Sequence, residues 1–92
     1  MRGQRGRSAL VKPRILFVDD EPNVLSGLRR ALHARDAIWD MQFVSRPEEA
    51  VALHREQPFD VVITDMRMPL MSGVEMILAM RRLATHTVYI LL

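Results

Sequence analysis

The sequence predicts an α/β fold in which helices cover both faces of a doubly wound parallel sheet. The first observation is that short, unbroken apolar runs alternate along the chain with segments of helical periodicity. Such runs suit strands that are buried on both faces, and alternating strands and helices produce right-handed βαβ units. The second observation is that two of the runs stop abruptly at an acid, after Val18 and after Thr64.

The first strand and helix are expected within residues 15–32. Residues 15–18 (ILFV) form an unbroken apolar run and should be a strand. Pro22 follows closely, and proline favours the first turn of a helix. Behind it, five apolar residues recur at helical spacing on one side of the predicted helix: Val24, Leu25, Leu28, Ala31 and Leu32.

The second strand is expected in residues 41–44, followed by a second helix. Ser45 and Glu48 have the spacing of a capping box, which places Ser45 at the N-cap of that helix. The helix should end before Pro58, because the residue that precedes a proline disfavours helical backbone.

The third and fourth strands are expected in residues 61–64 (VVIT) and 88–92 (VYILL). Between them, Ser72 and Glu75 have the spacing of a second capping box. The helix that this capping box opens should turn four apolar residues toward the core: Ile77, Leu78, Met80 and Leu83.

Length and composition exclude several classes of protein. Ninety-two residues allow at most one domain, and no apolar run has the length of a membrane span or a signal peptide. The absence of cysteine excludes disulfides and thiolate chemistry, which fits a cytoplasmic protein. The three histidines, His33, His54 and His86, show no metal-ligand spacing and are expected on the surfaces of helices or loops.

Residues 1–13 are predicted to be a basic, disordered lead-in to a domain formed by residues 14–92. The first fourteen residues contain five basic side chains and no acidic one. Such a segment can contact nucleic acid or an anionic membrane, which stays open as an alternative. We favour a solvated segment, because a short basic tail alone is a weak indication of either partner.

Asp19, Asp20 and Asp65 follow the first and third predicted strands. Ligands of parallel α/β sheets bind beyond the carboxyl ends of the strands, where these acids are expected to meet if the two strands are neighbours. Clustered carboxylates repel one another and must either bind protons or hold a cation. Oxygen ligands favour a hard ion such as Mg²⁺. The alternative is that the acids form turns or cap helices, as Asp20 could do for the first helix.

Two motifs carry a family resemblance. Residues 15–22 (ILFVDDEP) resemble the opening signature of two-component response regulator receiver domains. Residues 65–73 (DMRMPLMSG) resemble the phosphoacceptor signature of the same domains. The resemblance covers about residues 14–92 and implies a flavodoxin-like receiver fold.

The resemblance also implies a function and a site. Asp65 would accept a phosphoryl group from a sensor histidine kinase, so the chain would be a phosphoacceptor signalling domain rather than an enzyme. Asp20 and Asp65 would bind Mg²⁺ (or Mn²⁺) directly, Asp19 would act largely through metal-bound water, and the backbone carbonyl of Arg67 would be a further ligand. The Arg67 side chain would lie near the phosphoryl group, with an exposed, solvated arginine as the alternative. Met68 and Pro69 would shape the loop.

The sequence departs from the family at its end. Complete receivers continue with a fifth strand, a last helix, a Ser or Thr after the fourth strand and a Lys after the fifth, whereas this sequence stops at Leu92. Residues 14–92 would then be an incomplete receiver with the fourth strand as an exposed edge. We expect it to be marginally stable alone, to form homo-oligomers through that strand, or to continue beyond Leu92 toward an output domain. The alternative function is a chemically impaired fragment that acts only as a protein-interaction module.

Overall fold

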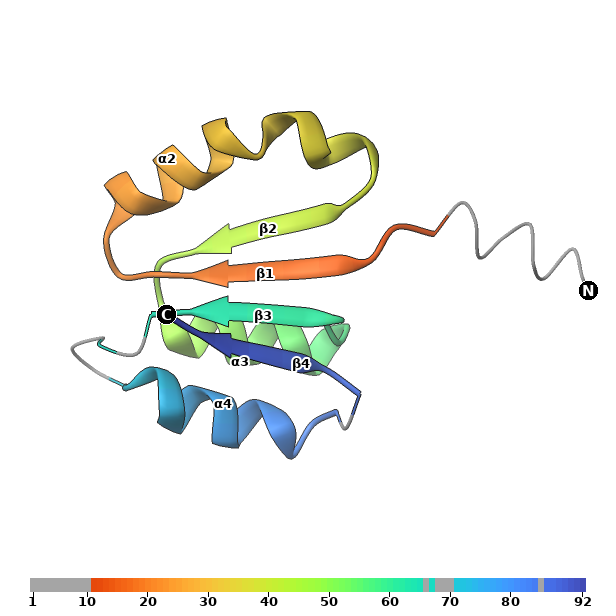
Figure 1. The fold of residues 1–92 in the computed structure, drawn as a ribbon. Coiled ribbons are helices and arrows are strands. Elements are labelled where there is room, and N and C mark those ends of the chain that lie inside the picture. Colours follow the sequence, from red (N-terminus) through yellow and green to blue (C-terminus); the bar gives the residue numbers. More distant parts are fainter. Residues whose placement is uncertain (1–10, 66, 68–70, 85) are drawn as a thin grey trace, which may run out of the picture.

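The computed structural model describes residues 11–65, 67, 71–84 and 86–92. Strands and helices alternate along the chain, as the sequence predicts (Figure 1). Their order is β1 (Arg14–Val18), α2 (Pro22–Ala31), the 3₁₀ helix η1 (His33–Ala37), β2 (Asp40–Val44), α3 (Pro47–Glu56), β3 (Val61–Thr64), α4 (Gly73–Arg81) and β4 (Val88–Leu91). Within these residues, no helix is long and apolar enough to cross a membrane.

The four strands form one parallel sheet in the order β2-β1-β3-β4. The central pair, β1 and β3, is aligned so that Val18 lies opposite Thr64. The carboxyl ends of both strands therefore meet at the same edge of the sheet. This order and the parallel pairing confirm the predicted α/β fold.

Helices cover the sheet on both faces (Figure 1). Because side chains alternate along a strand, Ile15 and Phe17 of β1 point toward α2, where they pack with Leu25. Leu16 and Val18 point to the opposite face. There they form the larger core cluster with buried residues of β2, α3, β3 and α4 and with Phe59: Val44, Ala50, Phe59, Val62, Met76, Ile77 and Met80.

The predicted start of the second helix was wrong by one residue. The N-cap of α3 is Arg46 rather than Ser45, and no side chain among the described residues caps this end. The Glu48 carboxylate instead accepts a hydrogen bond from the Arg46 guanidinium (2.8 Å). The reason is Pro47, which restricts the preceding residue to extended backbone, as the φ of −125° and ψ of 125° at Arg46 show.

The second predicted capping box is confirmed at the start of α4. Ser72 Oγ accepts the Glu75 N–H (3.1 Å), and the Glu75 carboxylate accepts the Ser72 N–H (3.1 Å). The predicted inner face of this helix was partly wrong, because Leu78 is 50% exposed whereas Met76 is fully buried. Ile77 and Met80 are buried, as expected.

The strand β4 lies at the edge of the described sheet. Tyr89 packs against the larger core cluster. Val88 and Ile90 point to the opposite face, which α2 covers at β1 and β2, and they remain 58% and 41% exposed. Among the described residues, the fourth strand is thus an edge of the sheet with exposed apolar side chains.

The two serines at the predicted capping boxes give a matched test of this fold. We expect Ser72→Ala to lower the free energy of unfolding by about 1 kcal/mol, because the Glu75 N–H loses its side-chain acceptor. Ser45→Ala should change it by less than about 0.5 kcal/mol, because that hydroxyl does not cap α3. Urea denaturation of both variants measures the difference, and equal losses would contradict the assigned helix starts.

Candidate functional site

The three acids singled out in the sequence lie at the carboxyl ends of the two central strands. Asp19 and Asp20 directly follow β1, and Asp65 directly follows β3. The Asp19 N–H donates to the Val44 carbonyl of β2, and the Asp65 N–H donates to the Val18 carbonyl of β1, both at 3.2 Å. The backbone of the acids is thus an extension of the sheet.

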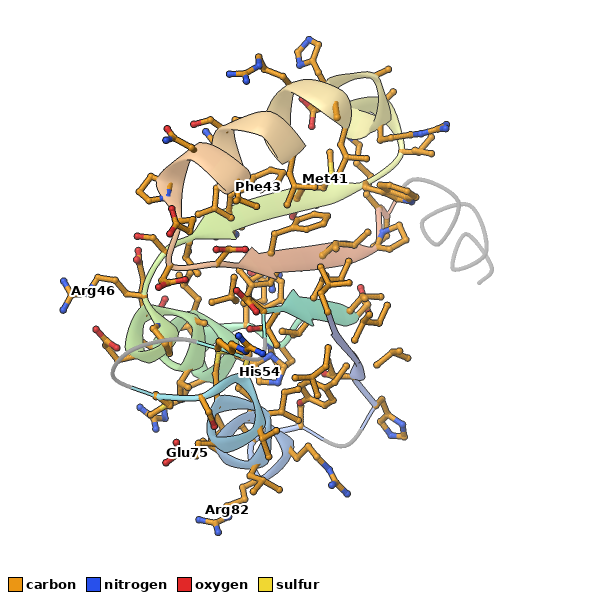
Figure 2. All side chains as sticks on the ribbon, turned by 60° about the vertical axis from the view of Figure 1, so that its left-hand side comes forward. Met41, Phe43, Arg46, His54, Glu75 and Arg82 are labelled. Carbon is orange, nitrogen blue, oxygen red and sulfur yellow. The ribbon has the colours of Figure 1, made fainter. Side chains whose placement is uncertain are left out.

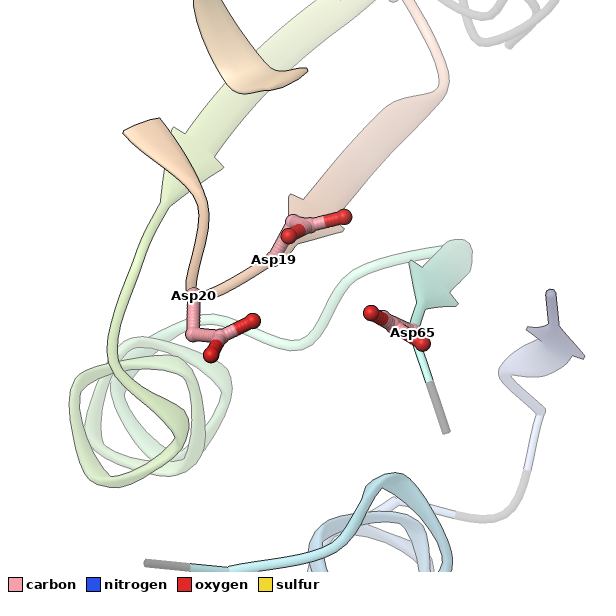
Figure 3. Close-up of side chains that lie close together, drawn as sticks. All are labelled: Asp19, Asp20 and Asp65. Atoms are coloured by element: carbon pink, nitrogen blue, oxygen red, sulfur yellow. The ribbon is translucent and has the colours of Figure 1, made fainter. Parts of the chain in front are cut away.

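The side chains of these acids converge on one point (Figure 3). One carboxylate oxygen from each of Asp19, Asp20 and Asp65 lies within 4.8 Å of the other two, and all three residues are half-buried. The structure therefore brings together the acids that the sequence predicts to meet.

Local hydrogen bonds orient two of the three carboxylates. Asp19 Oδ1 accepts the Glu21 N–H at 2.9 Å, and Asp65 Oδ1 accepts the Arg67 N–H at 3.1 Å. Both are turn-forming contacts that acids make with the backbone two residues later. They restrict the rotation of each side chain and so help to keep an oxygen at the centre of the cluster.

The alternative that Asp20 caps the first helix is not what the structure shows. The N-cap of α2 is Glu21, Pro22 follows at the first helical position, and no described side chain caps this end. Asp20 is therefore left to point toward Asp19 and Asp65, as Figure 3 shows.

The electrostatics of the cluster are unfavourable without a cation. Two unit charges about 5 Å apart repel by about 1 kcal/mol in water and by about 3 kcal/mol near a protein surface. In the part of the chain that the structure describes, the ion pairs involve other acids, namely Asp36, Asp40 and Glu48. Three converging oxygen ligands suit a hard divalent ion, so the residues present fit Mg²⁺ or Mn²⁺.

Thr64 is a site residue that the sequence reading missed. Its side chain is fully buried, and its hydroxyl donates to the Asp65 carbonyl at 3.0 Å. This bond holds the peptide group of Asp65 from the buried side of the strand. The sequence did contain an indication of this role, because Thr64 is the polar last residue of an otherwise apolar strand and directly precedes Asp65.

Two further predictions for the site stay predictions. Arg67 is exposed, and a metal-ligand role for its carbonyl rests on the family resemblance. Met68 and Pro69 lie outside the described residues.

Charge repulsion within the cluster predicts a stabilising substitution. In buffer with a chelator, Asp20→Asn should raise the free energy of unfolding by on the order of 1 kcal/mol, because one repelling charge is removed. Glu56→Gln, at an exposed acid of α3, should leave stability within about 0.5 kcal/mol. Thermal denaturation measures both variants, and a loss of stability in Asp20→Asn would contradict a repulsive cluster.

Comparison with known proteins adds the family to this geometry. The response regulator receiver domain family matches residues 15–92. A response regulator receiver protein of Anaeromyxobacter is 40% identical over 70 residues, which are 76% of this chain and 29% of the relative. The chain thus spans less than a third of that relative's length.

Solved structures agree with this assignment. A response regulator receiver domain from Clostridium thermocellum superposes with a TM-score of 0.76 at 28% identity, covering 86% of this chain and 63% of its own. The chemotaxis response regulator CheY4 of Vibrio cholerae superposes with a TM-score of 0.75 at 28% identity, covering 88% of this chain and 68% of its own. The chain belongs to the receiver domains of two-component response regulators.

Proposed function

We propose that this chain is a phosphoacceptor module that receives a phosphoryl group on Asp65 from a sensor histidine kinase, with Mg²⁺ as the required ion. The observation that carries the proposal is the convergence of Asp19, Asp20 and Asp65 within 4.8 Å at adjacent strand ends. The convergence supplies both a nucleophilic carboxylate and a place for a hard cation beside it.

Asp65 is the nucleophile in this proposal, because it opens the segment that resembles the phosphoacceptor signature, residues 65–73. A carboxylate oxygen of Asp65 attacks the phosphorus in line, a new O–P bond forms, and the N–P bond to the histidine of the kinase breaks. The product is an acyl phosphate on Asp65 and a histidine that regains its nitrogen lone pair. The Asp65 N–H donates to the Val18 carbonyl and the Thr64 hydroxyl donates to the Asp65 carbonyl, and these bonds hold the backbone of the attacking residue in place during this transfer.

The neighbouring acids have a supporting role. Asp20 and Asp65 would hold the ion directly, with Asp19 acting through bound water and the Arg67 carbonyl as a further ligand. A divalent ion at this point supplies positive charge next to the transferring phosphoryl group. Because Asp19 is already oriented by the Glu21 N–H, it can position water without rearranging the turn.

Partners follow from the same proposal. The donor would be a cytoplasmic histidine kinase. The readout would lie in an output domain, since the chain covers only a part of each longer relative that it matches. Among those relatives is a hydrogenase transcriptional regulatory protein of Cupriavidus necator, 40% identical over 67 residues, 13% of its length.

The second candidate function is a protein-interaction module without phosphoryl chemistry, which the exposed apolar residues of β4 favour.

Phosphoryl labelling tests the first proposal. The chain, incubated with Mg²⁺ and a small acyl phosphate donor, should gain one phosphoryl group that hydroxylamine removes. Asp65→Asn should abolish the label, because the amide cannot act as the nucleophile, whereas Glu56→Gln should retain it. Mass spectrometry measures the added group, and equal labelling of Asp65→Asn and the parent chain would reject Asp65 as the acceptor.

Metal binding gives an independent test that separates the two candidates. Mg²⁺ at about a hundred times its dissociation constant should raise the free energy of unfolding by about 2.7 kcal/mol, and Asp20→Asn should remove most of this gain. Beryllofluoride with Mg²⁺ should stabilise the chain further, as an analogue of the phosphoryl group. Thermal melts that shift with neither addition would favour the interaction module.

A further inference from the structure

His54 is buried in the interior, contrary to its expected place on a helix surface. It lies in the last turns of α3 with a fully buried side chain. Figure 2 shows the ring among side chains of neighbouring elements, whereas Arg46 and Arg82 point away from the molecule. The imidazole is at the amino-terminal end of the sheet, opposite to the end that carries the three acids. The proposed phosphoacceptor chemistry leaves this residue without a role.

Both ring nitrogens of His54 have partners on other elements. Nδ1 accepts the Phe59 N–H at 3.1 Å, and Nε2 lies 3.5 Å from the Tyr89 hydroxyl of β4. Because Nδ1 accepts a hydrogen bond, it carries no proton in this arrangement, so the neutral ring holds its proton on Nε2 and can donate it to Tyr89. The ring also stacks on Phe59, with an interplanar angle of 6°, and meets Tyr89 edge-on.

Phe59 is the point at which these contacts join three elements. Its N–H is bonded to His54 of α3, and its carbonyl accepts the Thr87 hydroxyl, just before β4, at 2.6 Å. Its ring is buried in the larger core cluster. The segment that leads into β3 is thus fixed to α3 on one side and to β4 on the other.

The charges around this group oppose a second proton on His54. The Arg14 guanidinium of β1 lies 4.2 Å from the centre of the Phe59 ring, on which His54 also stacks. Burial first, and the Arg14 charge second, lower the pKa of His54 below its ordinary value of 6.5. Burial raises the pKa of Tyr89, and this effect outweighs the Thr87 hydroxyl and the positive charge of Arg81 on α4, which both lower it.

Two acids contact Arg14, the charged residue beside Phe59. The Asp60 carboxylate accepts the Arg14 backbone N–H at 2.7 Å, and the Asp40 carboxylate of β2 pairs with the Arg14 guanidinium at 3.5 Å. Arg55 and Glu56, which follow His54 on α3, are exposed. The histidine therefore faces an aromatic, positively biased environment.

We propose that His54 is a pH-sensitive latch, closed while its imidazole is neutral, that joins α3 to the start of β3 and to β4. A second proton would occupy Nδ1, so the Phe59 N–H would lose its acceptor and face another donor. The charged ring would also lie buried next to Arg14. Opening would release the segment around Phe59 together with the Thr87 end of β4.

The direction of the pH dependence follows from this arrangement. The folded chain binds the proton more weakly than the unfolded chain, so the stabilisation by His54 is complete above pH 6.5 and decreases as the pH falls below it. Each pH unit in that range multiplies the unfolding constant by up to about ten, until the folded-state pKa is reached. Most carboxylates titrate at lower pH, so the window just below 6.5 isolates histidine.

The test compares His54→Asn with His86→Asn. The Asn oxygen at position 54 can replace Nδ1 as the acceptor for Phe59 but does not titrate, and His86 is an exposed histidine. From pH 7.5 to 5.5, the unfolding constant of the parent chain should rise up to about tenfold more than that of His54→Asn. His86→Asn should behave like the parent. An equal pH response in His54→Asn and the parent chain would overturn the latch.

A second measurement uses the unsubstituted chain and is independent of how well the variant folds. In an NMR titration, His54 should be the neutral Nε2–H tautomer at pH 7 and should take up its second proton only below its ordinary pKa of 6.5. The Phe59 amide should exchange with solvent faster as the pH falls from 6.5 to 5.5, after correction for the intrinsic pH dependence of exchange. A His54 that takes up its second proton at or above pH 6.5, or a Phe59 amide whose corrected exchange is constant, would contradict the proposal.

Discussion

The parallel pairing of β1 with β3 is the constraint on which the rest of the structure depends. A shift of one residue would turn Leu16 and Val18 out of the larger core cluster, because side chains alternate between the faces of a strand. Burial of these residues therefore fixes the register, and the register places Val18 opposite Thr64. Asp19 and Asp65 follow directly. The geometry of the acidic cluster is thus determined by the apolar packing of Leu16 and Val18, three residues and one residue before Asp19, which offsets the repulsion among the acids.

Patterns that are local in sequence allowed most of the fold and the acidic site to be predicted. The apolar runs gave the strands, and the acids after two of them gave the cluster, because parallel strands in a βαβ arrangement end at the same edge. The two serines show the limit of such patterns. Ser45 and Ser72 share the same spacing to a glutamate, but Pro47 forces Arg46 into extended backbone and moves the helix start. That correction was available from the sequence.

The surroundings of His54 were not available in the same way. Its burial depends on Phe59, Tyr89 and Arg14, of which Tyr89 and Arg14 are 35 and 40 positions away in the sequence. A histidine at a helical position has the same local pattern whether it faces solvent or an aromatic partner. Whether His54 is exposed or buried depends on the tertiary structure. The strand order places β4 next to β3, and His54 of α3 contacts Phe59 before β3 and Tyr89 of β4. Leu78 shows the converse, an apolar residue that the packing of α4 leaves exposed.

The two polar groups lie at opposite ends of the sheet, and direct electrostatic coupling between them is weak. Strands of four or five residues separate them by about 15 Å, which exceeds the Debye length of about 8 Å at physiological ionic strength. A mechanical connection exists instead through β4. Its start is held by the bond from Thr87 to Phe59, and its end by the Leu92 N–H, which donates at 2.9 Å to the carbonyl of Thr64. Between these ends, β4 is held by its pairing with β3 and by the packing of Tyr89 in the core, while Val88 and Ile90 remain largely exposed. β4 therefore contacts the surroundings of both polar groups, at Phe59 through Thr87 and at Thr64 through Leu92, and Thr64 in turn supports the backbone of Asp65.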